Sequence, residues 1–239
     1  MGKDHLLYGR NVLAEAIASG ARVREIYCAN KQAEEFVHTL SKKNQKLSIR
    51  PGNLPREVLD REHQGVAFKV EHDFYLNGSP RDWAPYKFIV LCNHLQDVQN
   101  LGALSRAAAG FGVDLIVHES RRSVKLNPAA IKVSAGQAFR LKYLEVSNIV
   151  PILQSLKQEN YTAIGLDAGD HASYIYDWKP TLPLALVVGS EGDGLSKPVM
   201  NQVDFCLQVP MREGVESLNA SHAASIAMSW VFSKTLTAS

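Results

Sequence analysis

The sequence lacks a strong charge of either sign, a set of cysteines for disulfides, and any long apolar run. Its 239 residues carry 26 Lys and Arg against 24 Asp and Glu, so a net charge of +2 gives no global field for a nucleic acid. Cys28, Cys92 and Cys206 form an odd, widely spaced set, which excludes a disulfide framework. The N-terminus MGKDHLLYGRN has no apolar signal core, and no window approaches transmembrane length. We therefore expect a reduced, cytoplasmic protein without a membrane partner.

Several motifs of known chemistry are also missing. The eight histidines include no H-E-x-x-H pair, so we expect no metal site. No G-x-G-x-x-G run is present, which counts against a Rossmann-type oxidoreductase. No Cys or Ser stands beside an evident base, so nucleophilic catalysis is not indicated. His63 and His222 are interpreted as structural or RNA-contacting, and the N-x-S/T sequons at Asn160 and Asn219 as accidental in a chain that is not exported.

The pattern that is present is an α/β pattern in two parts. Alternating short helices and strands predict a compact α/β domain over residues 1–72. Closely spaced turn signals over residues 73–86 predict a linker. Over residues 87–239, strands with continuous apolar runs separated by helices predict a mainly parallel sheet covered on both faces. The expected helices are 12–20, 33–43, 55–62, 101–111, 129–139, 149–160 and 220–239, and the expected strands are 23–29, 47–50, 65–71, 87–93, 114–119, 141–146, 162–168, 184–190 and 205–211.

Three loops follow strands of the expected parallel sheet, where ligands of such folds bind. The first, HLQDVQNLGALSRAAAGFGV, carries Asp97 and Asn100 and places Arg106 in the first turns of an Ala-rich helix. The guanidinium of Arg106 is suited to grip a phosphate or carboxylate at the strand end. The alternative is that Asn100 caps the helix and Arg106 is a solvated surface charge.

The second loop, SEGDGLS, follows the strand LALVVG, so that Gly189, Gly192 and Gly194 surround Glu191. Glycines let backbone groups face a ligand directly, although a plain turn remains an alternative. The third loop, REGVESLNASHAAS, contains Ser217 and Asn219 just before an Ala-rich helix. Either residue is also suited to be the N-cap of that helix.

Local charge gives one further indication. Residues 119–142 contain Arg121, Arg122, Lys125, Lys132, Arg140 and Lys142 against Glu119 alone, a net of +5. Such a stretch is suited to follow a phosphate backbone, although basic runs are often only solvated faces.

Together the three loops resemble the motifs of the SpoU/TrmH family of RNA ribose 2′-O-methyltransferases, within the SPOUT class. The motifs appear in order as DVQNLGALSRAAAGFGV, LALVVGSEGDGLS and VPMREGVESLNASHAA. The resemblance implies a trefoil-knotted α/β domain that binds S-adenosyl-L-methionine, a homodimer with the active site at its interface, and an L30e-like N-terminal domain that binds RNA. The stretches YGRNVLAEAI, EHQGVAFKV and SRRSVKLNPAAIKVSAGQAF resemble the branch that methylates a guanosine in large-subunit (23S) ribosomal RNA.

The resemblance also implies roles for individual residues. The polar residues of the active site are Asn100, Arg106, Glu191, Ser217 and Asn219. The cofactor rests on backbone groups of Gly189, Val209, Met211 and Leu218. Two positions depart from the family pattern: Val98 stands where a proline is usual, and His222 where the family has small or branched apolar residues. Neither departure removes a functional group.

The predicted function is therefore methyl transfer from S-adenosylmethionine to a ribose 2′-hydroxyl of ribosomal RNA. One alternative is a transfer-RNA ribose methyltransferase. The other is a non-enzymatic RNA-binding or assembly factor with a degenerate domain, which the five polar residues named above count against.

Overall fold

The computed structural model describes residues 2–41, 47–78, 83–169, 171–190, 192, 194–214 and 217–235. The chain forms two compact units. The first consists of Met1–Phe74 together with Leu126–Arg140, and the second of Tyr75–Lys125 and Leu141–Ser239. Leu126–Arg140, which we expected inside the second domain, therefore belongs to the first unit.

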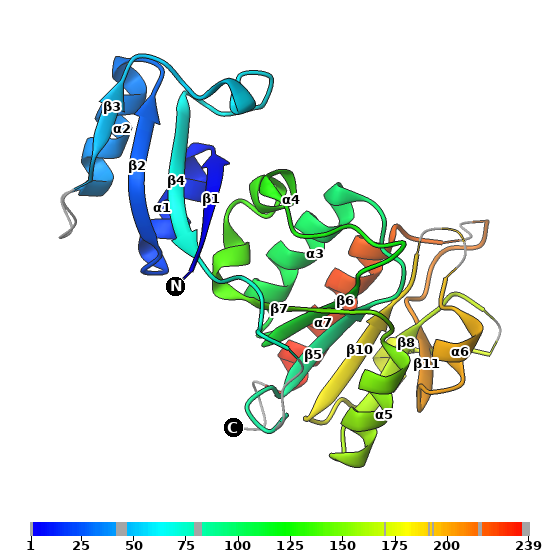
Figure 1. Ribbon diagram of the computed structural model, residues 1–239. Helices are drawn as coiled ribbons and strands as arrows, with labels where there is room; N and C mark the ends of the chain where they lie inside the picture. The colour runs from blue at the N-terminus through cyan, green and yellow to red at the C-terminus, as the bar shows by residue number, and fades with distance from the viewer. Residues whose placement is uncertain are drawn as a thin grey trace. The chain divides into compact units, whose positions relative to one another are not determined.

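The first unit is built on a sheet that has four strands in the described residues, in the order β1-β4-β2-β3. β4 pairs antiparallel with both β1 and β2, and β3 pairs parallel with β2. Helices α1 and α2 pack beside this sheet (Figure 1). The bounds are β1 (Lys3–Tyr8), α1 (Arg10–Ala18), β2 (Arg22–Cys28), α2 (Lys31–Ser41), β3 (Ile49–Pro51), the 3₁₀ turn η1 (Arg56–Val58) and β4 (Val66–His72).

The segment Leu126–Arg140 completes the first unit with α4 (Pro128–Val133) and the 3₁₀ turn η2 (Gln137–Arg140). Asn127 caps α4 by accepting a hydrogen bond from the Ala130 N–H at 2.9 Å. Phe139 packs on His72 and Phe74 with ring centroids 5.0 Å apart in both pairs. These apolar and aromatic contacts join the segment to the end of β4.

The second unit contains a sheet of seven strands among the described residues, in the order β7-β6-β5-β10-β8-β11-β9, with every pair parallel. Strands β5 and β10 are fully buried, as their continuous apolar runs predict, and β6 is fully buried as well. The bounds are β5 (Phe88–Cys92), β6 (Leu115–Glu119), β7 (Lys142–Val146), β8 (Thr162–Leu166), β9 (Ser173–Tyr174), β10 (Leu184–Val188) and β11 (Phe205–Gln208).

Helices cover both faces of this sheet (Figure 1). On one face, α5 packs through Ile152, Leu153 and Leu156 on alternate strand residues such as Leu91 and Val187. On the other face, α3 packs against α7. The bounds are α3 (Val98–Gly110), α5 (Val150–Gln158), the 3₁₀ turn η3 (Ile175–Asp177), α6 (Lys197–Met200) and α7 (Ala220–Thr235). No helix among the described residues is long and apolar enough to cross a membrane.

Two expected helices differ from the structure. The helix expected at 129–139 is broken into α4 and η2, because Ala135 and Gly136 adopt φ angles of 54° and 87°. The helix expected at 55–62 is only the single turn η1. Part of the expected linker is also attached to the second unit, since the Leu76 N–H donates to the Tyr143 carbonyl at 2.8 Å.

Candidate functional site

A cavity of about 410 Å³ lies at the carboxyl ends of three neighbouring strands, β8, β10 and β11. Its apolar walls come from strand-end side chains such as Leu166, Val188 and Leu207. The rest of the wall is made by the segments that follow these strands. Since parallel strands end at one edge of the sheet, residues distant in the sequence meet here.

The turn after β10 forms one wall through very close backbone packing. Ser190 and Gly194 exchange two backbone hydrogen bonds of 3.1 and 3.2 Å. A Cβ atom on Gly189 would lie 2.3 Å from the carbonyl carbon and oxygen of Gly194. Gly194 itself has a φ of +63°, which favours glycine. The glycines predicted to bring backbone groups to a ligand thus form a tight turn on the cavity.

The residues just before α7, Ser217, Leu218 and Asn219, form another part of the wall. The Asn219 side-chain oxygen accepts hydrogen bonds from the Ser221 N–H at 2.9 Å and the Ser221 hydroxyl at 2.6 Å. Asn219 is therefore the N-terminal cap of α7 and also lines the cavity. The expected cap is confirmed, and it is compatible with a role at the site.

All four residues expected to hold a cofactor line this cavity: Gly189, Val209, Met211 and Leu218. Asp167, at the end of β8, also lines it and was not predicted from the sequence. Its carboxylate accepts a hydrogen bond from the Ala168 N–H at 2.7 Å and lies 3.7 Å from His171 Nε2. The sequence prediction placed Asp167 inside the strand expected at 162–168, whereas β8 ends at Leu166. A carboxylate within an otherwise apolar run was the sequence signal that could have singled it out.

Asn100 and Arg106 lie on α3 and do not line the cavity. Asp97 caps α3 through the Gln99 N–H at 2.9 Å, so the interpretation of Asn100 as the cap is wrong. Asn100 is buried within the helix, at 3% exposure. Arg106 is exposed, and within the part of the chain that the structure describes it makes no ion pair or hydrogen bond. The prediction for Glu191 lies outside the described residues.

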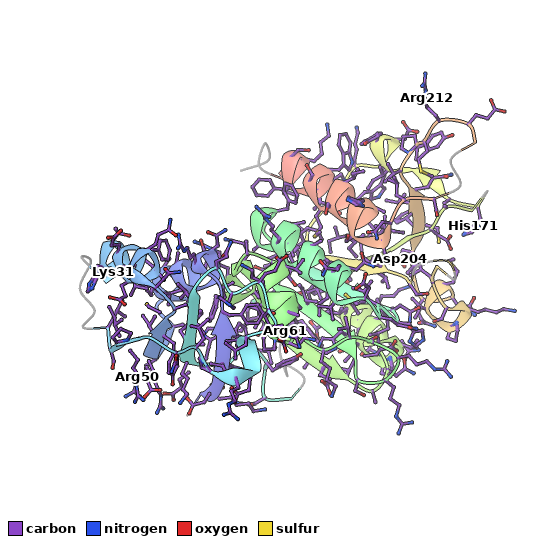
Figure 2. The ribbon with its side chains drawn as sticks, turned by 90° about the horizontal axis from the view of Figure 1, so that it is seen from above. Lys31, Arg50, Arg61, His171, Asp204 and Arg212 are labelled. Carbon is purple, nitrogen blue, oxygen red and sulfur yellow. The ribbon has the colours of Figure 1, made fainter. Side chains whose placement is uncertain are left out.

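The basic residues of the stretch 119–142 are divided between the two units. Lys132 and Arg140 belong to the first unit, where Lys132 donates to Gln64 at 2.8 Å and Arg140 pairs with Glu15 at 2.9 Å. Burial lowers the pKa of Lys132. In the second unit, Lys125 pairs with Glu145 at 2.9 Å, while Arg121 and Arg122 are exposed. Figure 2 shows a further exposed cation, Arg212, pointing outward from the loop after β11.

The three cysteines are free, and burial raises the pKa of each thiol. The effect is largest at Cys92, the last residue of β5, where the pKa is raised to about 12. A thiol with such a pKa is protonated at neutral pH and is a poor nucleophile. The cysteines therefore give no support to covalent catalysis.

Two family models match the chain. One, described as the SpoU rRNA Methylase family, matches residues 87–229, and one described as RNA 2′-O ribose methyltransferase substrate binding matches residues 6–76. A protein of Staphylococcus haemolyticus named as a TrmH family tRNA/rRNA methyltransferase is 33% identical over 244 residues, which cover 97% of this chain and 96% of the relative.

Solved structures share the fold over nearly the whole chain. The SpoU methyltransferase AviRb from Streptomyces viridochromogenes aligns with a TM-score of 0.76 at 20% identity, over 98% of this chain and 91% of that protein. It has also been solved in complex with its cofactor AdoMet, S-adenosylmethionine. An rRNA methyltransferase from Sinorhizobium meliloti aligns with a TM-score of 0.71 at 15% identity, over 96% of this chain and 87% of that protein. The predicted α/β methyltransferase fold is confirmed, while the trefoil knot and the L30e-like character of the first unit stay predictions.

Proposed function

Because the chain belongs to the SpoU rRNA Methylase family, and so is an RNA 2′-O-ribose methyltransferase, we propose that its substrate is a guanosine of large-subunit (23S) ribosomal RNA. The observation that carries this proposal is the extent of the first unit. It includes the substrate-binding match and also the segment Leu126–Arg140, whose sequence resembles the ribosomal RNA branch. A separate substrate-binding unit suits a large structured RNA, which is recognised mainly by shape and backbone contacts.

The methyl donor is S-adenosylmethionine, and the cavity fits it. A volume of about 410 Å³ lies in the range of small-molecule sites. Gly189, Val209 and Met211 line the cavity, and backbone groups at these positions would suit the polar edge of an adenine base, while Leu166 and Leu207 suit its apolar faces. The carboxylate of Asp167 suits a positively charged or hydroxyl group of the cofactor.

When bound, the cofactor supplies a methyl group on a sulfonium, which is already a good leaving group. The protein must hold the ribose hydroxyl in line with that methyl group and stabilise the charge that develops on the hydroxyl oxygen. We assign this role to Arg106. A guanidinium stays protonated, so Arg106 acts by orienting the hydroxyl or its neighbouring phosphate and by electrostatic stabilisation, not as a base. Asn100 and Glu191 would fix this arrangement, and Ser217 and Asn219 would complete the pocket.

Substitution of Arg106 tests this assignment directly. We expect Arg106→Ala to slow RNA methylation by at least about 10²-fold, because the loss of one preorganised donor at a developing negative charge has an effect of that size. The affinity for S-adenosylmethionine, measured by calorimetric titration, should stay near the wild-type value because Arg106 does not line the cavity. Arg106→Lys keeps the charge but loses the planar guanidinium, so its methylation rate should lie between the rates of the wild type and of Arg106→Ala. Methylation by Arg106→Ala at the wild-type rate would contradict the assignment.

We propose that the active unit is a homodimer formed through the exposed side of α7. A shallow hollow there is lined by Phe111, Tyr176, Ile226 and Trp230. Tyr176 is 47% exposed and its ring packs edge-on against Trp230, with centroids 5.3 Å apart. The aromatic residues come from three segments: Phe111 follows α3, Tyr176 lies in η3 and Trp230 lies on α7. Accessible aromatic side chains gathered at one hollow are typical of a protein interface. Sedimentation equilibrium should give twice the chain mass, and Trp230→Glu should shift it toward one chain.

Mapping of 2′-O-methyl groups separates the possible substrates. We place the protein in the cytoplasm, so total RNA from a cell that lacks it should be compared with RNA from the same cell after the gene is restored. Restoration of one methylated guanosine in 23S ribosomal RNA is the expected result. Restoration of a methyl group in transfer RNA, with none in ribosomal RNA, would contradict the substrate while leaving the methyltransferase activity intact.

A further inference from the structure

Two buried polar side chains outside the cavity are not used by the roles assigned above. Asn93 follows β5 and is 1% exposed, and Glu119 ends β6 and is 5% exposed. One carboxylate oxygen of Glu119 accepts from the Ile149 N–H at 3.3 Å, and the other accepts from the Asn93 side-chain amide at 3.3 Å. Asn93 Oδ1 in turn accepts from the Ser196 N–H at 2.8 Å. Buried polar groups linked in this way are costly to leave unsatisfied.

The hydrogen bonds that join Ser196, Asn93 and Glu119 can be arranged in only one way, with Ser196 donating to Asn93 and Asn93 donating to Glu119. A carboxylate accepts hydrogen bonds and donates none, so the NH₂ group of Asn93 must face Glu119. The amide oxygen of Asn93 then faces the Ser196 N–H, as observed. Glu119 therefore decides which way the Asn93 amide is turned. His94 Nδ1, 3.0 Å from the Glu119 carboxylate, adds a contact that is too poorly directed to be a hydrogen bond.

Ser196 links this chain of hydrogen bonds to the cavity wall. It lies two residues after Gly194, whose reciprocal bonds with Ser190 close the turn that lines the cavity. One end of that turn is fixed because β10 pairs with β5 and β8. The other end is fixed by the buried side chain of Leu195 and by the bond from Ser196 to Asn93. The cavity wall is thus anchored from strands β5 and β6, whose side chains do not line the cavity.

We propose that Asn93 and Glu119 are positioning residues for S-adenosylmethionine: Glu119 orients Asn93, and Asn93 holds Ser196, and through it Gly194, at the wall of the cofactor cavity. The inference rests on the proposed function, because it takes this cavity as the cofactor site. Neither side chain touches the cofactor in this arrangement. Loss of either one changes the affinity for the cofactor more than the rate of the bound complex.

Two isosteric substitutions and their combination test the proposal. Asn93→Asp still accepts from Ser196 but sets a second carboxylate against Glu119. Glu119→Gln presents an amide NH₂ either to Asn93 or to Ile149, where a donor meets a donor. In the double variant, the new amide at position 119 can donate to the new carboxylate at position 93, and that carboxylate can still accept from Ser196. The amide oxygen at position 119 can accept from Ile149, so the chain of hydrogen bonds is complete again with its middle bond reversed.

We expect each single variant to raise the dissociation constant and KM for S-adenosylmethionine by about tenfold, in line with an unsatisfied buried polar group. The turnover at saturating cofactor should fall by less than about twofold, since the reacting groups are unchanged. The double variant should recover to within about threefold of the wild type. Asn127→Asp, at the cap of α4, and Glu145→Gln, at the exposed pair with Lys125, are matched controls that should bind the cofactor normally.

Thermal unfolding without cofactor shows whether a variant is folded before its affinity is interpreted. If Asn93→Asp does not fold, Ser196→Pro removes the N–H donor without a change in φ, because the Ser196 φ of −64° is one that proline adopts. Cofactor affinity unchanged in folded Ser196→Pro or in both single variants overturns the positioning role. The positioning role is also overturned if the double variant loses as much free energy of S-adenosylmethionine binding as the two single variants lose together. A wild-type protein that binds no S-adenosylmethionine overturns the proposed function and the positioning role together.

Discussion

Gly189 shows how a single residue can define the cavity. A methyl group there would meet the carbonyl of Gly194 at 2.3 Å, and that contact is to backbone, which cannot rotate away. Overpacking of this kind costs about 1–3 kcal/mol. We therefore expect Gly189→Ala to open the turn after β10 and to weaken S-adenosylmethionine binding by at least about tenfold in a calorimetric titration.

A second glycine gives the control for this prediction. Gly110, in the last turn of α3, has open space around the position of its Cβ atom and a normal φ. Gly110→Ala should bind the cofactor as the wild type does and should be slightly more stable. Normal binding by Gly189→Ala would show that the turn can move aside, and would contradict the role given to its backbone.

The start of α3 carries a prediction at the scale of an element. Val98 is the first residue of the helix, a position that proline favours because its N–H has no partner within the helix. Asp97, the residue before it, has a φ of −88° and a ψ of 130°, which a following proline permits. Val98→Pro should therefore stabilise the protein by about 0.4–1 kcal/mol by restricting the unfolded chain. Urea unfolding measures this change.

Proline further inside the helix should have the opposite effect. Ala103 lies inside α3, where proline removes a hydrogen bond and clashes with the preceding turn at a cost of about 3 kcal/mol. If Val98→Pro is as destabilising as Ala103→Pro, then the helix does not begin where Asp97 caps it. The departure of Val98 from the family pattern is thus interpreted as a loss of rigidity at the helix start and not as a change of function.

Elements with a continuous apolar run were the ones that the sequence predicted well. β5 and β10 are apolar and buried along their whole length, so their composition alone marks them. β1 was missed because only its last two residues, Leu7 and Tyr8, are buried. The two-residue strand β9 and the four-residue helix α6 are too short for any periodic pattern.

The candidate site was predicted in part, because its loops follow strands that the sequence marks by their apolar runs. The three loops were visible in the sequence because glycines and polar residues directly follow apolar strands. Asp167 and the pair Asn93–Glu119 were not singled out, because their significance depends on which strands are neighbours in the sheet. The family resemblance supplied the cofactor positions, and the structure places those four residues around one cavity.

At the scale of the whole molecule, the two units are not consecutive in the sequence. A cut before Tyr75 removes β1 to β4 but leaves Leu126–Arg140 in the chain. That segment has Ala130, Ile131, Ala138 and Phe139 buried at 5% exposure or less. Without its partners, this apolar surface is exposed to water, which is typical of chains that aggregate.

Two truncated chains therefore should behave differently. A chain that begins at Tyr75 should bind a hydrophobic dye and unfold at a lower temperature than the full chain. A second chain, in which a Gly-Ser linker also replaces Leu126–Arg140, should lose the dye signal and keep S-adenosylmethionine binding, because every residue of the cavity remains. It should no longer methylate RNA, since the substrate-binding unit is absent.

If the simple truncation at Tyr75 is as soluble and heat-stable as the chain with the linker, the segment Leu126–Arg140 does not depend on the first unit. The two units would then be separable at residue 74, as a linear reading of the sequence predicts.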